Sequence, residues 1–139
     1  KGSIIPFRFN NWSDLEKIVK TNAKSCAAII LEPCRETLPE KEYLLELRKI
    51  ATKNKCVLIF DEITSGWRLN TGGAHLKFKV NPDIVVYGKT IANGIPMSAI
   101  VGRKKIIKYV LKTFISSSFW TERLGPACAL TFIKKHKSV

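Results

Sequence analysis

Three short apolar runs constrain the fold of this chain more than any other feature. The runs AAIIL, CVLIF and DIVVY are each too short for a typical helix and do not alternate between apolar and polar residues. Strands of this kind are typical of parallel sheets, in which both faces of a strand are buried. Between the first two runs, residues 39–55 carry apolar side chains at helical spacing. The alternation of strands with helices predicts an α/β domain with a mostly parallel sheet.

Capping and turn residues place the other elements. Ser13 and Glu16 have the spacing of a capping box, which predicts that a short helix begins at Ser13. A glycine-rich loop is expected over 65–75, after the second strand. The later elements are expected to be a strand at 97–102, a helix at 104–112, a strand-like stretch at 113–118 and a helix at 126–137.

The charge of the chain is strongly positive but dispersed. Lys and Arg number 24 against 11 Asp and Glu, for a net charge of +13. A basic surface of this size is compatible with nucleic-acid binding, yet the basic residues are spread over several segments without an aromatic binding module. Solvated lysine-rich helix faces are therefore the favoured interpretation, and no nucleic-acid partner is expected.

Other broad classes are disfavoured by composition and by the chain's first residues. No apolar run approaches the ~20 residues of a membrane helix, so no membrane partner is expected. The chain begins at Lys1 without a signal segment, and we expect it to be part of a longer cytoplasmic protein. Its four cysteines lack paired spacing and its two histidines lie far apart, so we expect free thiols and no metal site.

Chemistry is expected where the parallel strands end. Ligands of α/β sheets bind at the carboxyl ends of the strands, which selects Asp61 and Glu62, Gly88 and Lys89, and the segment 116–121. A lysine that follows a buried strand and a glycine can be partly desolvated, which makes its amine a nucleophile towards aldehydes. Asp61 could pair with the ring nitrogen of a cofactor bound to that lysine. Glu62 should point away from Asp61, because successive strand residues face opposite sides.

The order and spacing of several segments resemble one enzyme family. These segments are AAIILEP, YLLELRKIATKNKCVLIFDEITSGWR and GGAHLKFKVNPDIVVYGKTIANGIPMSAIVGRKKI. Together they resemble the large domain of class III pyridoxal-phosphate-dependent aminotransferases over nearly the whole chain. FDEITSGWR and SSSFWTERLGP are most similar to the glutamate-1-semialdehyde 2,1-aminomutase branch. The resemblance implies a three-layer α/β/α fold of the aspartate aminotransferase type, with residues 1–139 forming part of the cofactor-binding domain.

The resemblance also implies roles for individual residues. Lys89 matches the lysine that forms a Schiff base with pyridoxal 5'-phosphate and moves the substrate proton. Asp61 matches the aspartate that pairs with the pyridine nitrogen, and Ile63 the aliphatic residue against the ring. Thr121 matches a threonine that binds the cofactor phosphate across a homodimer interface. Thr64 stands where many members have glutamine, and TERLGP where T-x-S-G-N-P is common.

The expected activity is transfer of an amino group from a small-molecule donor to a carbonyl acceptor, or within one molecule. Part of the phosphate site should precede this chain, and the small domain should follow it, so we expect residues 1–139 to be inactive alone. The same absent segments leave donor and acceptor unassigned. The alternatives are a basic α/β module that binds polyanions without catalysis, and a family member with a decayed site. His75 is interpreted as a structural loop residue.

Overall fold

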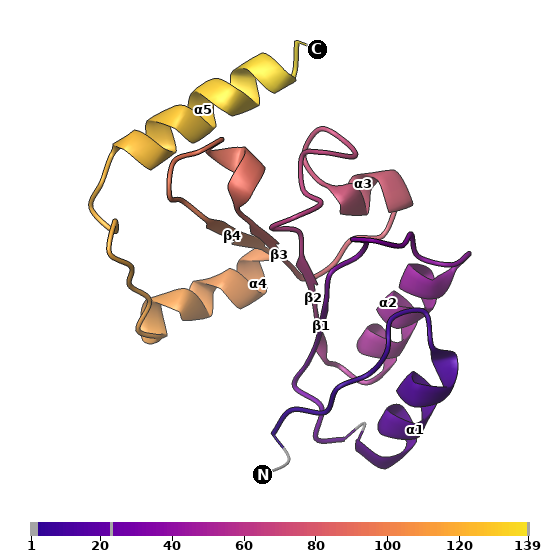
Figure 1. Cartoon of the computed structure of the whole chain (residues 1–139). Helices are drawn as coiled ribbons and strands as arrows, with labels where there is room; N and C mark the ends of the chain where they lie inside the picture. Colours follow the sequence, from indigo (N-terminus) through magenta and orange to yellow (C-terminus); the bar gives the residue numbers. More distant parts are fainter. Residues whose placement is uncertain (1–2, 23, 139) are drawn as a thin grey trace.

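The computed structural model describes residues 3–22 and 24–138, which include a four-stranded sheet with helices around it (Figure 1). The strands β1 (Ala28–Leu31), β2 (Val57–Asp61), β3 (Ile84–Tyr87) and β4 (Ala99–Gly102) follow one another in that spatial order. The first three are parallel, and β4 is antiparallel to β3. The predicted α/β domain with a mostly parallel sheet is therefore confirmed.

The helices lie around this sheet. α1 (Trp12–Asn22) and α2 (Tyr43–Lys53) are beside β1 and β2 in Figure 1, and α3 (Ala74–Phe78) follows β2. On the other side of the view are α4 (Lys104–Ile107), the 3₁₀ helix η2 (Lys108–Lys112) and α5 (Leu124–His136). A further 3₁₀ turn, η1 (Lys89–Ile91), begins directly after β3. None of the described helices is long and apolar enough to cross a membrane.

One face of the sheet carries the core. Buried apolar residues of α1 and α2 pack against Ile29, Leu58 and Phe60 in a first cluster. A second cluster joins Val85 and Tyr87 of β3 to the loop after β2 and to α5. On the opposite face, Ile30 and Ile100 are 58% and 52% exposed. The described residues therefore cover this second face only in part.

Several local predictions were wrong. Ser13 does not cap α1; the helix begins at Trp12, and Asn11 Oδ1 accepts the hydrogen bond from Asp14 N. The helix expected from residue 39 begins at Tyr43, because Glu42 adopts a left-handed conformation with φ 67°. The helix expected over 104–112 changes to 3₁₀ geometry at Lys108, and no strand forms over 113–118. α3 was not predicted, since its five residues follow two glycines.

A buried charge network holds the start of β3. Asp83 Oδ2 accepts hydrogen bonds from Arg48 Nη1 of α2 at 2.7 Å and from Leu58 N of β2 at 2.9 Å. Arg103, just after β4, forms a 3.1 Å ion pair with the other carboxylate oxygen. Burial by itself raises the pKa of Asp83, but the hydrogen bonds and both arginines outweigh it and lower that pKa below its usual value.

Candidate active site

The carboxyl ends of β2 and β3 are neighbours in the sheet. Asp61, the last residue of β2, pairs with Val86, and Lys89 follows Val86 by three residues. The structure therefore brings the predicted residues Asp61 and Lys89 to one edge of the sheet. This proximity follows from the parallel register, which directs both strand ends to the same side.

Lys89 is an exposed residue in an unusual backbone conformation. Its φ angle is 44°, a positive value that it shares with six other non-glycine residues among those described and that costs such a residue about 1–3 kcal/mol. Its Nζ donates a 2.8 Å hydrogen bond to Thr64 Oγ1. Thr64 is thus the side chain that holds the lysine amine.

Asp61 and Ile63 are organised by the turn that follows β2. The backbone N–H of Ile63 donates to Asp61 Oδ1 at 3.0 Å, which orients that carboxylate. The Ile63 side chain lies against Gly88, where an added Cβ would stand 3.2 Å from Ile63 Cγ2. Gly88 therefore allows the aliphatic side chain of one strand end to approach the backbone of the next.

Glu62 and His75 form a buried pair beneath this turn. Glu62 is fully buried, and its Oε1 is 2.8 Å from His75 Nδ1. Asp61 is only partly buried, so the two adjacent carboxylates occupy different environments, as strand alternation suggested. The pairing itself was not predicted, because no sequence periodicity links residues that are 13 positions apart.

Thr121 lies in an exposed turn before α5. Among the described residues, no hydrogen bond joins its side chain to Asp61, Ile63 or Lys89. The sheet register and the turn after β2 bring Asp61, Ile63 and Lys89 together, whereas no hydrogen bond of the described residues links Thr121 to them. The role of Thr121 towards a second subunit stays a prediction.

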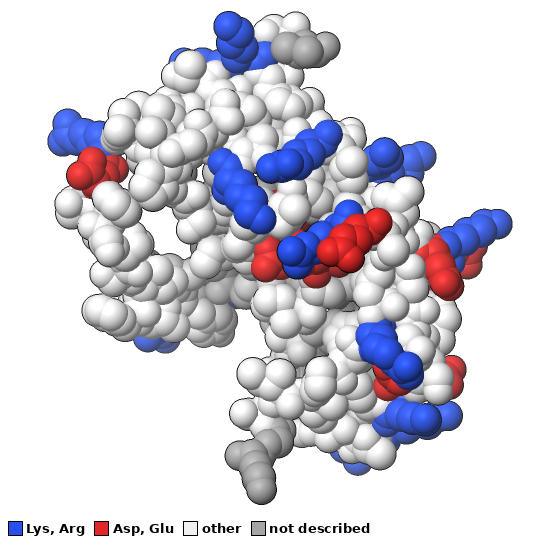
Figure 2. All heavy atoms as spheres, in the orientation of Figure 1, with Lys and Arg blue, Asp and Glu red and all other residues white. Residues whose placement is uncertain are grey.

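The positive charge is distributed over the surface. Figure 2 shows Lys and Arg side chains separated from one another across the visible face, several of them beside Asp or Glu. At the candidate site, Arg68 Nε donates to Thr90 Oγ1 at 3.2 Å, next to Lys89. Within residues 3–22 and 24–138, no group of three or more His, Cys, Asp or Glu side chains is arranged to hold a metal ion.

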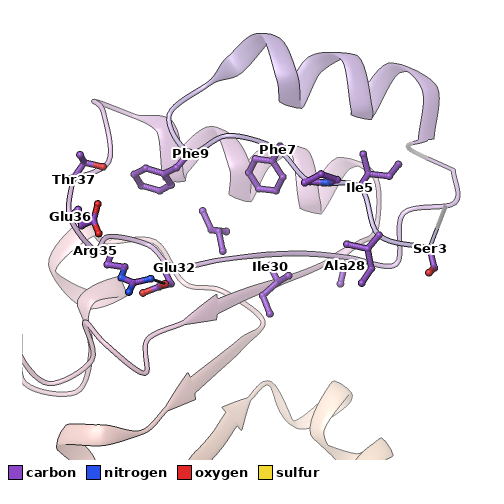
Figure 3. A pocket seen from close by; sticks show the side chains of 13 residues that line it. Ser3, Ile5, Phe7, Phe9, Ala28, Ile30, Glu32, Arg35, Glu36 and Thr37 are labelled. Carbon is purple, nitrogen blue, oxygen red and sulfur yellow. Dashed lines mark hydrogen bonds and ion pairs between the residues drawn. The ribbon is translucent and has the colours of Figure 1, made fainter. Parts of the chain in front are cut away.

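A large groove lies away from these residues. It has a volume of about 650 Å³ and separates the extended segment 3–9 from β1. Figure 3 shows Phe7 and Phe9 along one side of it and Ile30 along the other, with Glu32 and Arg35 at one end. Because neither Asp61 nor Lys89 lines it, this groove is distinct from the candidate active site.

Solved structures with a similar arrangement of elements include a transaminase with pyridoxal phosphate bound, which covers 93% of this chain with a TM-score of 0.85 at 23% identity. The FumI protein of Sphingopyxis sp. MTA144 covers 97% of this chain with a TM-score of 0.90 at 23% identity. An omega-transaminase from Sphaerobacter thermophilus covers 96% with a TM-score of 0.87 at 24% identity. This chain corresponds to 34% of the FumI protein and 32% of the omega-transaminase. The fold is therefore that of part of the pyridoxal-phosphate transferase large domain, as predicted.

Sequence comparison then defines the family. The profile of the class III aminotransferases matches residues 9–134, so the chain belongs to that family. It is 35% identical to a 3-aminobutyryl-CoA aminotransferase of Cloacimonas acidaminovorans, over 94% of this chain and 33% of the relative. It is 37% identical to a glutamate-1-semialdehyde 2,1-aminomutase of Nitrosopumilus maritimus, over 91% of this chain and 31% of the relative. The chain thus spans about a third of these relatives, and the resemblance to the aminomutase branch is confirmed.

Proposed function

We propose that the protein containing this chain transfers amino groups with pyridoxal 5'-phosphate, which Lys89 binds as a Schiff base. The observation that carries this proposal is the placement of Lys89 and Asp61 at the ends of adjacent parallel strands. When bound, the cofactor supplies an aldehyde for amines and an electron-withdrawing ring. Membership of the class III family supports this cofactor and this reaction class.

The residues at the strand ends fit such a group. Lys89 is exposed, so its amine is accessible to the aldehyde carbon of a cofactor. The hydrogen bond from Nζ to Thr64 Oγ1 fixes the direction in which the amine points. Asp61 Oδ1 is engaged by Ile63 N, which leaves Oδ2 to accept a hydrogen bond from a protonated ring nitrogen. A carboxylate at that position keeps the ring protonated, because an opposite charge favours the charged form.

The contact between Ile63 and Gly88 supplies an apolar wall for the ring. A Cβ added to Gly88 would stand only 3.2 Å from Ile63 Cγ2, so the Ile63 side chain is closely packed against this backbone. When its amine is free, Lys89 would take the proton from the substrate α-carbon and deliver it to another carbon of the bound substrate or cofactor. A lysine suits this exchange because its amine serves first as nucleophile and then as base.

The further features of the enzyme are also part of the proposal. We infer that residues 1–139 are part of a large domain whose remaining strands and small domain belong to the longer protein. Thr121 would then bind the phosphate of the cofactor in the second subunit of a homodimer. The substrates are a small-molecule amino donor and a carbonyl acceptor, or one molecule that contains both groups, in the cytoplasm. On the face shown in Figure 2, the dispersed basic side chains do not form a continuous patch for a polyanion.

The test is chemical mapping of the cofactor lysine in the longer protein. Borohydride reduction should fix the cofactor to Lys89, and Lys89→Ala should lose the covalent product. Lys105→Ala changes an exposed lysine of α4 and is the matched control. Cofactor attached to another lysine would contradict the proposal.

A further inference from the structure

The buried carboxylate of Glu62 closes the loop that carries the candidate site. Its Oε2 accepts a hydrogen bond from Ala74 N at 2.6 Å, and its Oε1 accepts one from His75 N at 2.8 Å. His75 Nδ1 is also 2.8 Å from Oε1. Since an ionised carboxylate only accepts hydrogen bonds, this contact places the proton on Nδ1. One side chain at the start of the loop thereby binds the backbone and the side chain at its end.

Tyr87 connects the same loop to the strand that leads to Lys89. Its hydroxyl donates a hydrogen bond to the carbonyl oxygen of Gly72. The loop backbone approaches the tyrosine closely, because a Cβ at Gly66 would stand 2.8 Å from Tyr87 Cδ1 and one at Gly73 2.7 Å from its hydroxyl. The Gly73 Cβ would also stand 2.8 Å from Glu62 Oε2. Glu62, Tyr87 and the partly buried His75 therefore form one polar cluster under loop 63–73.

We propose that Glu62 is a positioning residue, which fixes loop 63–73 and thereby the placement of Ile63 and Thr64 relative to Lys89. This inference rests on the proposed function, because it assigns Glu62 a role towards the cofactor site. Backbone hydrogen bonds, which do not depend on the side chain, fix the near end of the loop: Glu62 N donates to Val86 O, and Glu62 O accepts from Gly66 N at 2.8 Å. The carboxylate of the same residue holds the far end through Ala74 N and His75 N, so Glu62 joins the two ends of the loop that presents Ile63 and Thr64.

A glutamine cannot replace this carboxylate. Glu62 accepts from three N–H groups with two oxygens, and the amide of glutamine has only one acceptor oxygen. Its amino group would face either Ala74 N or the His75 donors. Because buried donors without partners are unfavourable, the loop in Glu62→Gln should open at residues 74–75. Opening there releases the far end of loop 63–73 while the strands remain paired.

The test uses the longer protein and two measurements on Glu62→Gln. The dissociation constant of pyridoxal phosphate is measured by titrating the apo-protein, and amide hydrogen exchange is measured over 63–75. Leu47→Ala is the control, because Leu47 is fully buried in the first core cluster and belongs to α2. We expect Glu62→Gln to weaken cofactor binding at least tenfold and to accelerate exchange over 63–75. Leu47→Ala should lower the melting temperature and leave binding within twofold of the wild type.

A second variant keeps the inference testable if Glu62→Gln does not fold. Tyr87→Phe removes only the hydroxyl that binds Gly72 O and should accelerate exchange over 70–75 while it weakens cofactor binding. Wild-type affinity and exchange in the folded variants would overturn the positioning role. Equal loss of affinity in Leu47→Ala would also overturn it, since the effect would then be general destabilisation. A wild-type protein that binds no pyridoxal phosphate would instead refute the proposed function.

Discussion

Replacement of Asp83 with asparagine should destabilise the sheet by about 3 kcal/mol. The carboxylate connects four elements, because it pairs with Arg48 of α2, Leu58 N of β2 and Arg103 after β4 from its place before β3. The Asp83 side chain is 7% exposed and that of Arg48 17%. Asparagine keeps one acceptor oxygen but leaves the guanidinium of Arg48 without a counter-charge.

The magnitude follows from the burial of each partner. Loss of one member of a buried ion pair costs about 3–5 kcal/mol, chiefly because the other charge stays desolvated. Arg103 is 47% exposed, and a pair of that kind contributes only about 0–1 kcal/mol. The remaining amide oxygen can still accept from Leu58 N, which places the expected loss at the lower end of the range.

Urea denaturation of the longer protein at several pH values tests this reasoning. The pKa of Asp83 is lower in the folded state than the unfolded value of about 3.9, so the unfolded state binds more protons between those two pKa values. The contribution of the carboxylate is therefore fully present above that unfolded value and is lost as the pH falls through the folded pKa. The difference in unfolding free energy between the wild type and Asp83→Asn should therefore shrink as the pH falls over the same interval.

The control for this experiment is Glu46→Gln, which breaks an exposed pair with Lys49 on α2. It should change the free energy of unfolding far less than Asp83→Asn. If both variants have the same stability at neutral pH, the Asp83 network does not hold the sheet. If the loss of unfolding free energy in Asp83→Asn stays constant down to acidic pH, ionisation of Asp83 is not the source of that loss.

Three further outcomes are expected. The Asp61→Asn variant should still bind the cofactor, but its turnover should fall on the order of a hundredfold, because the amide no longer favours a protonated pyridine ring. Unchanged turnover in steady-state kinetics would make Asp61 a structural residue. Gly66→Ala should lower the free energy of unfolding, measured by urea denaturation, by about 2 kcal/mol, because the new Cβ would lie 2.6 Å from Glu62 O and 2.8 Å from Tyr87 Cδ1. Wild-type stability would mean that the turn relaxes freely. Residues 1–139 expressed alone should aggregate and lack activity, as judged by light scattering and half-transamination of glutamate; a soluble, active monomer would contradict this expectation.

The strands were predictable because their apolar runs reflect burial directly. β3 (Ile84–Tyr87) lies within its expected run, and β2 (Val57–Asp61) extends one residue beyond the apolar run CVLIF. The placement of Asp61 beside the start of the Lys89 turn then follows from parallel pairing. The antiparallel direction of β4 was not predictable from its residues, since alternation along a strand carries no direction. It follows from the short connection between Tyr87 and Ala99, which contains no crossover helix.

The errors occurred where tertiary contacts decide the local structure. The stretch 113–118 has β-forming residues, yet Phe114 is 95% exposed and no described strand lies beside it to accept pairing. The buried pair of Glu62 and His75 depends on a loop that returns to its origin, and neither residue type predicts such a return. The contact of the Thr64 hydroxyl was not predictable either, because only the position of Lys89 Nζ shows what it binds.

The short connection from β3 to β4 also has a consequence for the order of folding. Tyr87 pairs with Ala99 after 12 residues, whereas Ile59 pairs with Ile84 after 25. Closure of the shorter loop costs about 0.6 kcal/mol less in chain entropy, which favours the hairpin of β3 and β4 as the earlier pair. Pulse-labelled amide exchange should therefore show protection in β3 and β4 before β1. Because Lys89 lies within that hairpin, the lysine would acquire its local backbone geometry before β2 brings Asp61 beside it.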